Sequence, residues 1–250
     1  MPTVTSHGVP IAWHETGPAD GSPVLLVHGF GSNRAENWGS AGWEKVLSEA
    51  GFRAILVDLR GHGDSGRPEG ADHYTADLFI ADLVAVLDAL GLDRVDYLGY
   101  SFGARLGWDL ALAHPERVRR LALGGFSLGS PMTDFDITAA RAFIAEGTEI
   151  SHPLTAALMR MASLVPGNDL PRLVDLVEGV RGTELPPATE GPIPEAPTMI
   201  VVGERDAVAV GAGDLAADIG ADYVELPARS HASAITARRF KEAVIEWLGH

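Results

Sequence analysis

The sequence of 250 residues contains no cysteine. A disulfide framework is therefore excluded, and so is any metal centre or cofactor held by thiolate ligands. We expect the protein to need no cofactor and no metal ion. The lack of cysteine fits a reducing compartment, and we expect a cytoplasmic protein.

Long hydrophobic runs and an excess of basic residues are also missing. No stretch of about 18 uncharged apolar residues occurs, so no membrane span is expected. Residues 1–7 have neither the basic region nor the apolar run of a signal peptide. Lys and Arg total 19 against 34 Asp and Glu, which gives a formal net charge of −15. Such a charge repels phosphate backbones, so we expect no nucleic-acid partner. The partner that we expect is a small-molecule substrate. The oligomeric state stays open.

Hydrophobic residues make up 46% of the chain, which is enough for a sizeable core. Short runs rich in Val, Ile and Leu predict buried parallel strands at residues 23–28, 52–58, 95–99, 118–124, 197–203 and 221–226. Segments of helical period separate them, at residues 43–50, 76–90, 104–114, 213–219 and 235–248. This alternation predicts one α/β fold with a mostly parallel central sheet and helices on both faces. Residues 4–15 predict an antiparallel hairpin around Gly8, Val9 and Pro10.

The alternation of strand and helix stops between residues 127 and 195. Three helices are expected there with no strand between them, at residues 134–146, 152–164 and 169–180. A stiff connector is expected after them, because the chain carries Pro186, Pro187, Pro192, Pro194 and Pro197. We therefore expect a core formed by residues 1–126 and 196–250, interrupted by a helical cap at residues 127–195.

A Gly-x-Ser-x-Gly pattern occurs twice, around Ser101 and around Ser127. The pattern marks a catalytic serine only where a strand, a sharp turn and a helix follow one another. Ser101 follows a predicted strand and precedes a good helix that Pro115 ends. Ser127 is followed by Gly129, Ser130 and Pro131, which break any helix. The strand–turn–helix context therefore predicts Ser101 as the nucleophile and a glycine-rich hinge at Ser127.

Two further glycine-rich segments follow predicted strands. Residues 61–66 match Gly-x-Gly-x-x-Gly, the fingerprint of a dinucleotide site. Arg67 and Pro68 follow it where a helix would have to begin, so we interpret these residues as a structural turn. The sequence His-Gly-Phe-Gly at residues 28–31 follows the first core strand, where a loop that binds an oxyanion would be expected.

A serine nucleophile needs a base to accept its proton and a carboxylate to orient that base. His231 lies in a predicted loop before the last helix, whereas His250 is the terminal residue, so we select His231 as the base. Asp206 follows the strand 197–203 on its loop side and is the predicted acid, although Glu204 is nearby. The resulting order of Ser, Asp and His along the chain is the one that this kind of fold requires.

Together these segments resemble the α/β-hydrolase superfamily. The resemblance rests on His-Gly-Phe-Gly at 28–31, Asp-Leu-Arg-Gly-His-Gly-Asp-Ser at 58–65, Gly-Tyr-Ser-Phe-Gly at 99–103, Gly-Glu-Arg-Asp at 203–206 and His231. It covers nearly the whole chain except the insertion, and it implies the α/β-hydrolase fold. It also implies an oxyanion hole made of the backbone N–H groups of Phe30 and Phe102. One departure is Ser230, because many members of the superfamily have glycine directly before the histidine.

The resemblance also narrows the reaction. Dehalogenases and epoxide hydrolases of this superfamily use Asp where this chain has Ser101, and the epoxide branch uses cap tyrosines, which the insertion lacks. Carbon–carbon bond hydrolases often carry Trp after the histidine, where Ala232 stands here. We therefore expect a serine esterase that cleaves an apolar carboxylic ester or a lactone through an acyl-enzyme. A C–C bond hydrolase or cofactor-free lyase on the same triad, and a receptor-like protein with slow hydrolysis, stay open. Candidate pocket residues are Phe126, Phe143 and Met159.

Overall fold

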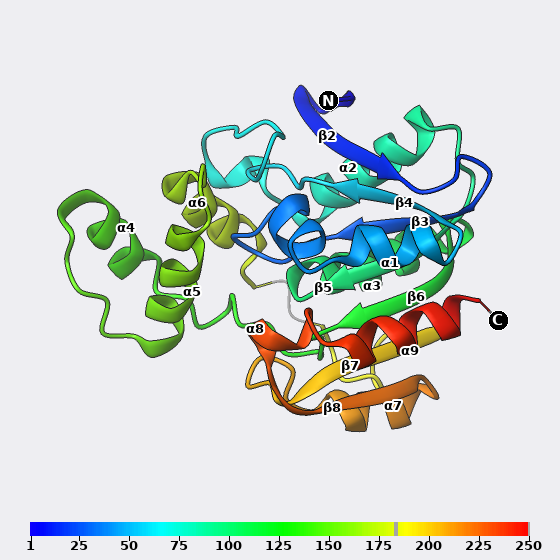
Figure 1. Cartoon of the computed structure of the whole chain (residues 1–250). Helices are drawn as coiled ribbons and strands as arrows, with labels where there is room; N and C mark the ends of the chain where they lie inside the picture. The colour runs from blue at the N-terminus through cyan, green and yellow to red at the C-terminus, as the bar shows by residue number, and fades with distance from the viewer. Residues whose placement is uncertain (183–184, 250) are drawn as a thin grey trace.

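The apolar strands form one sheet in the order β1-β2-β4-β3-β5-β6-β7-β8 in this computed structural model, which describes residues 1–182 and 185–249 (Figure 1). The strands are β1 (Thr3–Ser6), β2 (Val9–Thr16), β3 (Ser22–Val27), β4 (Phe52–Val57), β5 (Val95–Tyr100), β6 (Val118–Gly124), β7 (Thr198–Arg205) and β8 (Asp222–Ser230). Strands β3 to β8 pair in parallel, and β2 runs antiparallel to β1 and β4. The predicted mostly parallel sheet is therefore confirmed.

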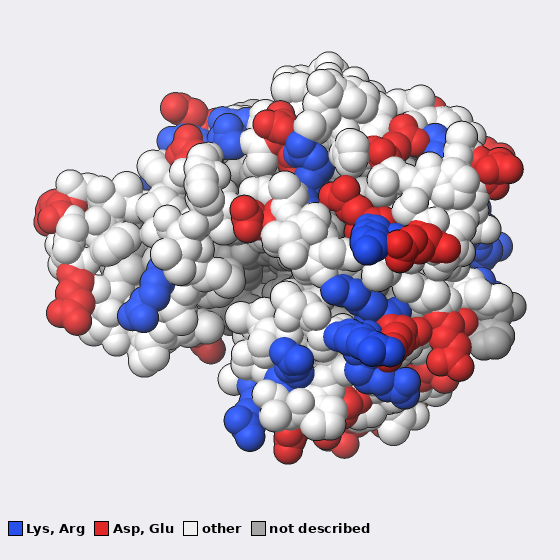
Figure 2. Space-filling model, viewed as in Figure 1, with Lys and Arg blue, Asp and Glu red and all other residues white. Residues whose placement is uncertain are grey.

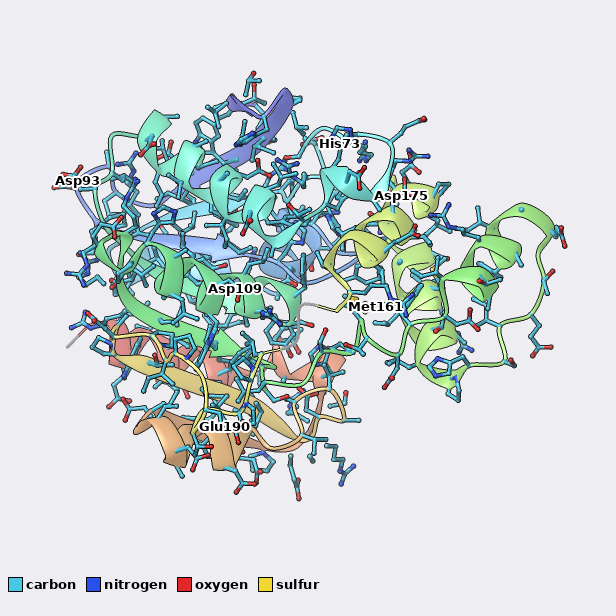
Figure 3. All side chains as sticks on the ribbon, turned by 180° about the vertical axis from the view of Figure 1, so that it is seen from behind. His73, Asp93, Asp109, Met161, Asp175 and Glu190 are labelled. Atoms are coloured by element: carbon cyan, nitrogen blue, oxygen red, sulfur yellow. The ribbon has the colours of Figure 1, made fainter. Side chains whose placement is uncertain are left out.

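Helices cover both faces of the sheet. Neighbouring residues of the central strands point to opposite sides and are apolar, so both faces must be buried. On one face, Leu25 and Val27 pack in a core with residues of α2 (Ala76–Ala89), α3 (Phe102–Ala113) and α7 (Ala212–Ile219). On the other face, Val24 and Leu26 pack with residues of α1 (Trp43–Glu49) and α9 (Arg238–Leu248). Figure 3, seen from behind, shows α2 and α3 in front of the sheet. Short helical turns complete the fold: η1 (Ala35–Gly39), η2 (Ala71–His73), η3 (Pro115–Arg117) and α8 (His231–Ala234).

Three helices without a strand between them connect β6 to β7, namely α4 (Ile137–Glu146), α5 (Pro153–Leu164) and α6 (Leu170–Val180). Asp136, His152 and Asp169 cap their N-termini by accepting backbone hydrogen bonds. The three helices lie beyond the carboxyl ends of the parallel strands (Figure 1). The described residues 185–197, which hold the five prolines, contain neither helix nor strand. None of the described helices has both the length and the hydropathy that crossing a membrane requires.

The structure differs from expectation at both ends of the chain. The N-terminal hairpin turns at His7 and Gly8, one or two residues earlier than expected, because both residues adopt positive φ. Strand β8 runs on to Ser230, so His231 begins the short helix α8 and does not lie in a loop. The reason is a capping box, in which Ser230 and Ser233 exchange hydrogen bonds and start a helix at once. The predicted helix 235–248 begins only at residue 238.

Candidate active site

Ser101 occupies a sharp turn between β5 and α3. Its φ of 55° and ψ of −116° are strained for a residue with a side chain. The turn also needs a close approach of the backbone, because a Cβ atom on Gly103 would lie 2.1 Å from the carbonyl oxygen of Val27. This strand–turn–helix geometry exposes the serine hydroxyl at the carboxyl edge of the sheet.

A continuous hydrogen-bonded chain joins the three residues that were selected from the sequence. The Nε2 atom of His231 lies 2.9 Å from the Oγ of Ser101, and its Nδ1 lies 2.9 Å from both carboxylate oxygens of Asp206. An ionised carboxylate can only accept hydrogen bonds, so Nδ1 carries the proton and Nε2 is left to accept from the serine hydroxyl. The structure therefore brings Ser101, His231 and Asp206 together in the order that activating a hydroxyl requires.

The side chain of Asp206 is 1% exposed and stays charged. Burial works against its charge, but the hydrogen bonds from His231 and from the N–H groups of Val208 and Ala209 outweigh that effect and lower the pKa of Asp206. The Asp206 carboxylate lies where it can stabilise the positive charge that arises when His231 accepts a proton.

Two residues that the sequence did not single out support the ring of His231. The hydroxyl of Tyr100 donates to the backbone carbonyl of His231 at 2.5 Å. Gly125 lies against the ring, so that a Cβ atom there would be 2.8 Å from Cε1 of His231. Gly125 opens the second Gly-x-Ser-x-Gly pattern, but nothing in that pattern indicates a contact with a residue so far along the chain. Ser127 itself directs its Oγ to the carbonyl oxygen of Val208, at 3.5 Å, while Ser101 holds the histidine.

The loop 28–31 passes beside the nucleophile. A Cβ atom on Gly29 would lie 3.2 Å from Cβ and 3.8 Å from Oγ of Ser101. Phe30, next in the loop, and Phe102, the first residue of α3, are both buried. The N-terminus of α3, with its partial positive charge, also begins directly after Ser101. The loop 28–31 and the first turn of α3 therefore both adjoin Ser101.

Two buried histidines hold this loop by hydrogen bonds to its backbone. His28 donates from Nδ1 to the Gly29 carbonyl and accepts at Nε2 from the N–H of Leu59. His62 accepts at Nε2 from the N–H of Gly31. Burial lowers the pKa of His28 to about 4 and that of His62 to about 3, so both rings are neutral at pH 7. His62 belongs to the residues 61–66, where the N–H of Ser65 donates to the carbonyl of His62 at 3.0 Å, as expected for a turn.

A small cavity of about 50 Å³ adjoins Ser101. Apolar side chains form much of its wall, and its lining includes Phe102, Leu106, Phe126, Met132, Val180 and Val208. Arg105 and Asp109, which form an ion pair, are the charged residues of the lining. One of the three candidate pocket residues, Phe126, lines this cavity. The other two belong to the hydrophobic core: Met159 is buried in it, and Phe143 packs against it. Among the described residues, no group of three His, Cys, Asp or Glu could hold a metal ion.

Comparison with protein families and curated proteins gives a consistent picture. The family model of the α/β-hydrolase fold matches residues 22–149. A bifunctional epoxide hydrolase 2 of Sus scrofa is 35% identical over 136 residues, which cover 52% of this chain and 23% of that protein. A 2-hydroxy-6-oxo-2,4-heptadienoate hydrolase of Pseudomonas putida is 39% identical over 137 residues, which cover 54% of this chain and 46% of that protein. The matches thus span less than half the length of these curated relatives.

Solved structures resemble the chain over its whole length. The enol-lactonase from Burkholderia xenovorans LB400 has a TM-score of 0.81 and 24% identity and covers 100% of both chains. A hydrolase from Pseudomonas aeruginosa PA01 has a TM-score of 0.81 and 28% identity, with 100% of this chain and 98% of that chain covered.

Proposed function

Because the chain belongs to the α/β-hydrolase fold family, we propose that it is a serine hydrolase that cleaves a carboxylic ester or a lactone through an acyl-enzyme. In this proposal Ser101 is the nucleophile, His231 the general base and Asp206 the carboxylate that orients the base. The observation that carries it is the unbroken chain of 2.9 Å contacts from Ser101 through His231 to Asp206.

The proposed reaction proceeds in two halves. His231 takes the proton of Ser101 as Oγ attacks the carbonyl carbon, and the N–H groups of Phe30 and Phe102 stabilise the oxyanion. The C–O bond to the leaving group then breaks, and His231 gives its proton to the departing oxygen. In the second half His231 activates a water molecule, which attacks the acyl-enzyme and releases the acid and Ser101.

The proposed substrate is small and mainly apolar. The cavity of about 50 Å³ beside Ser101 has a mainly apolar lining, which suits a short acyl group. Met132 and Val180, the last residue of α6, form part of its lining, which is why we propose that residues 127–195 act as a cap. Phe126 is the pocket residue that we retain.

The nucleophile also decides between the activities of the relatives. Ser101 stands where the epoxide-hydrolysing members of the superfamily are expected to have Asp, so we do not propose epoxide hydrolysis. A C–C bond hydrolase on the same triad is the second candidate, because the Pseudomonas putida relative is named a hydrolase of 2-hydroxy-6-oxo-2,4-heptadienoate. Ala232 after the base favours the ester or lactone hydrolase.

A fluorophosphonate probe and a set of p-nitrophenyl esters test the proposal. We expect the probe to label Ser101 in the folded protein and the short acyl esters to be hydrolysed fastest. Ser101→Ala should lose labelling and about 10⁶-fold in kcat, whereas Ser127→Ala should keep both. A folded protein that the probe leaves unlabelled would refute the serine hydrolase. Labelling without turnover of any ester would refute the esterase and point to the C–C candidate or to a receptor-like role.

A further inference from the structure

The loop that approaches Ser101 is a tight turn over residues 29–32. The N–H of Ser32 bonds to the carbonyl of Gly29 at 3.3 Å, and Gly31 adopts a φ of +65° at the third position, as in a type II turn. Phe30 occupies the second position, so the direction of its N–H depends on how the turn is held. Any group that fixes this turn therefore fixes a proposed oxyanion donor.

The core of the protein holds the turn through its amide groups. The N–H of Gly29 donates to Oδ1 of Asn37 at 3.3 Å, and the N–H of Gly31 donates to Nε2 of His62 at 3.1 Å. These bonds fix the residues on both sides of Phe30. The carbonyl of Gly31 points to the other side, toward the helices α4 to α6.

Asn168, in the loop between α5 and α6, meets that carbonyl. Its Nδ2 donates to the carbonyl of Gly31 at 2.7 Å and to the carbonyl of Ala162 at 2.9 Å. Both partners can only accept, so the orientation of the amide group is unambiguous. Ala162, near the end of α5, packs on the same turn, since a Cβ atom on Gly31 would lie 3.0 Å from the Cβ of Ala162.

We propose that Asn168 is a positioning residue for the oxyanion hole. It holds the turn 29–32 by its hydrogen bond to the carbonyl of Gly31, so the direction of the Phe30 N–H depends on whether the cap is packed against this turn. This inference rests on the proposed function, because it takes Phe30 as a donor. Asn168 does not touch the reacting atoms; it acts through Gly31. When the loop between α5 and α6 lifts, the turn keeps its bonds to Asn37 and His62 but loses the one from Asn168. The oxyanion hole therefore has all its supporting hydrogen bonds only when the cap is packed against the turn. Because the hole binds the oxyanion that develops in the transition state, this support favours the transition state over the bound ester.

Asn168→Ala tests this role in the full-length protein. We expect kcat for a short p-nitrophenyl ester to fall roughly 10- to 100-fold, less than the 10²–10³-fold typical of removing a donor outright. KM should stay within about twofold, because the ground state hardly uses the hole. Affinity for a boronic acid, whose tetrahedral adduct places an oxygen in the hole, should fall by the same factor as kcat. Asn168→Asp, which sets a carboxylate against two carbonyl oxygens, should lose at least as much.

Asp175→Ala is the matched control. Asp175, on α6, accepts from the N–H of Gly70 at 3.0 Å and so also ties the cap to the core, and it forms ion pairs with Arg141 and Arg172 within the cap. It should lower Tm while kcat stays within about threefold of the wild type. Equal losses of kcat in both variants would assign the effect to cap docking in general and overturn the role of Asn168. An unchanged kcat in Asn168→Ala would overturn it as well, while turnover and labelling of the wild type at Ser101 would leave the serine hydrolase standing.

Discussion

A methyl group at residue 125 would collide with the base of the proposed triad. Its carbon would lie 2.8 Å from Cε1 and 3.0 Å from Nδ1 of His231, so the ring must shift. Because misplacing a catalytic group by about 1 Å can cost 10²-fold, we expect Gly125→Ala to lose about 10² in kcat. Steady-state assays with a p-nitrophenyl ester measure this loss of kcat. Gly220→Ala is the control, since Gly220 also has positive φ but has nothing within 4 Å of its Cβ position. If both variants lose the same activity, backbone strain and not the collision is responsible.

Residues of the candidate site differ in how far the sequence reveals them. Ser101, Asp206 and His231 carry unusual chemistry and follow predicted strands, and the order of the fold selects them. Gly125 and Asn168 carry no such signal, because their importance comes from contacts with residues 106 and 137 positions away. Phe143 and Met159 show the converse problem. Their apolar side chains suit a pocket and a core equally, and only packing shows that Met159 is buried in the core.

The segment between β4 and α2 depends on a buried ion pair. Arg60 donates from Nε and Nη2 to the two carboxylate oxygens of Asp82 on α2, each at 2.6 Å, and both side chains are at most 1% exposed. Removing one partner leaves the other charge buried without compensation. We therefore expect Asp82→Ala to lower the free energy of unfolding by about 3–5 kcal/mol in urea denaturation.

A double variant separates the charge from the packing at this position. Arg60→Met combined with Asp82→Leu removes both charges and keeps apolar volume, so it should recover most of the lost stability. If the double variant is as unstable as Asp82→Ala, the loss comes from packing and hydrogen bonds such as that from Arg60 to the carbonyl of His73.

Helices and strands were predictable where one period dominates. The six parallel strands and the helices α1, α2 and α3 lie within a few residues of their predicted positions, because their apolar runs are continuous and bounded by glycine or proline. The region after β8 was less predictable. Apolar periodicity predicted one helix over residues 235–248. In the structure the capping box of Ser230 and Ser233 starts a separate short helix at His231. Capping chemistry thus prevailed over periodicity.

For the whole molecule, the sequence supplies the net charge but not its distribution. On the face seen in Figure 2, Lys and Arg side chains gather near α9, which carries Arg238, Arg239 and Lys241, and acidic side chains lie directly beside them. Side chains of both signs therefore lie side by side near α9, although the formal net charge is −15.

Buried neutral histidines should make the stability of the whole molecule depend on pH. The unfolded chain binds protons at His28 and His62 near pH 6.5, whereas burial lowers the folded pKa values to about 4 and about 3. Between these values the unfolded state holds more protons, so the free energy of unfolding rises with pH. Their contribution is complete above about pH 6.5 and is lost as the pH falls toward 4 and 3, with a slope of about 1.4 kcal/mol per pH unit for each histidine.

Urea denaturation at intervals from pH 7.5 to pH 5 measures this slope, in a range where most carboxylates are charged in both states. We expect this contribution to stay level above about pH 6.5 and stability to fall from there as the pH is lowered to 5. His62→Gln, whose Oε1 can still accept from the N–H of Gly31, removes one of the two titrating groups and should reduce the slope by about half. A free energy of unfolding that does not change between pH 7 and pH 5 would contradict the neutral, buried state of both rings, and with it the hydrogen bonds by which they support the turn beside Ser101.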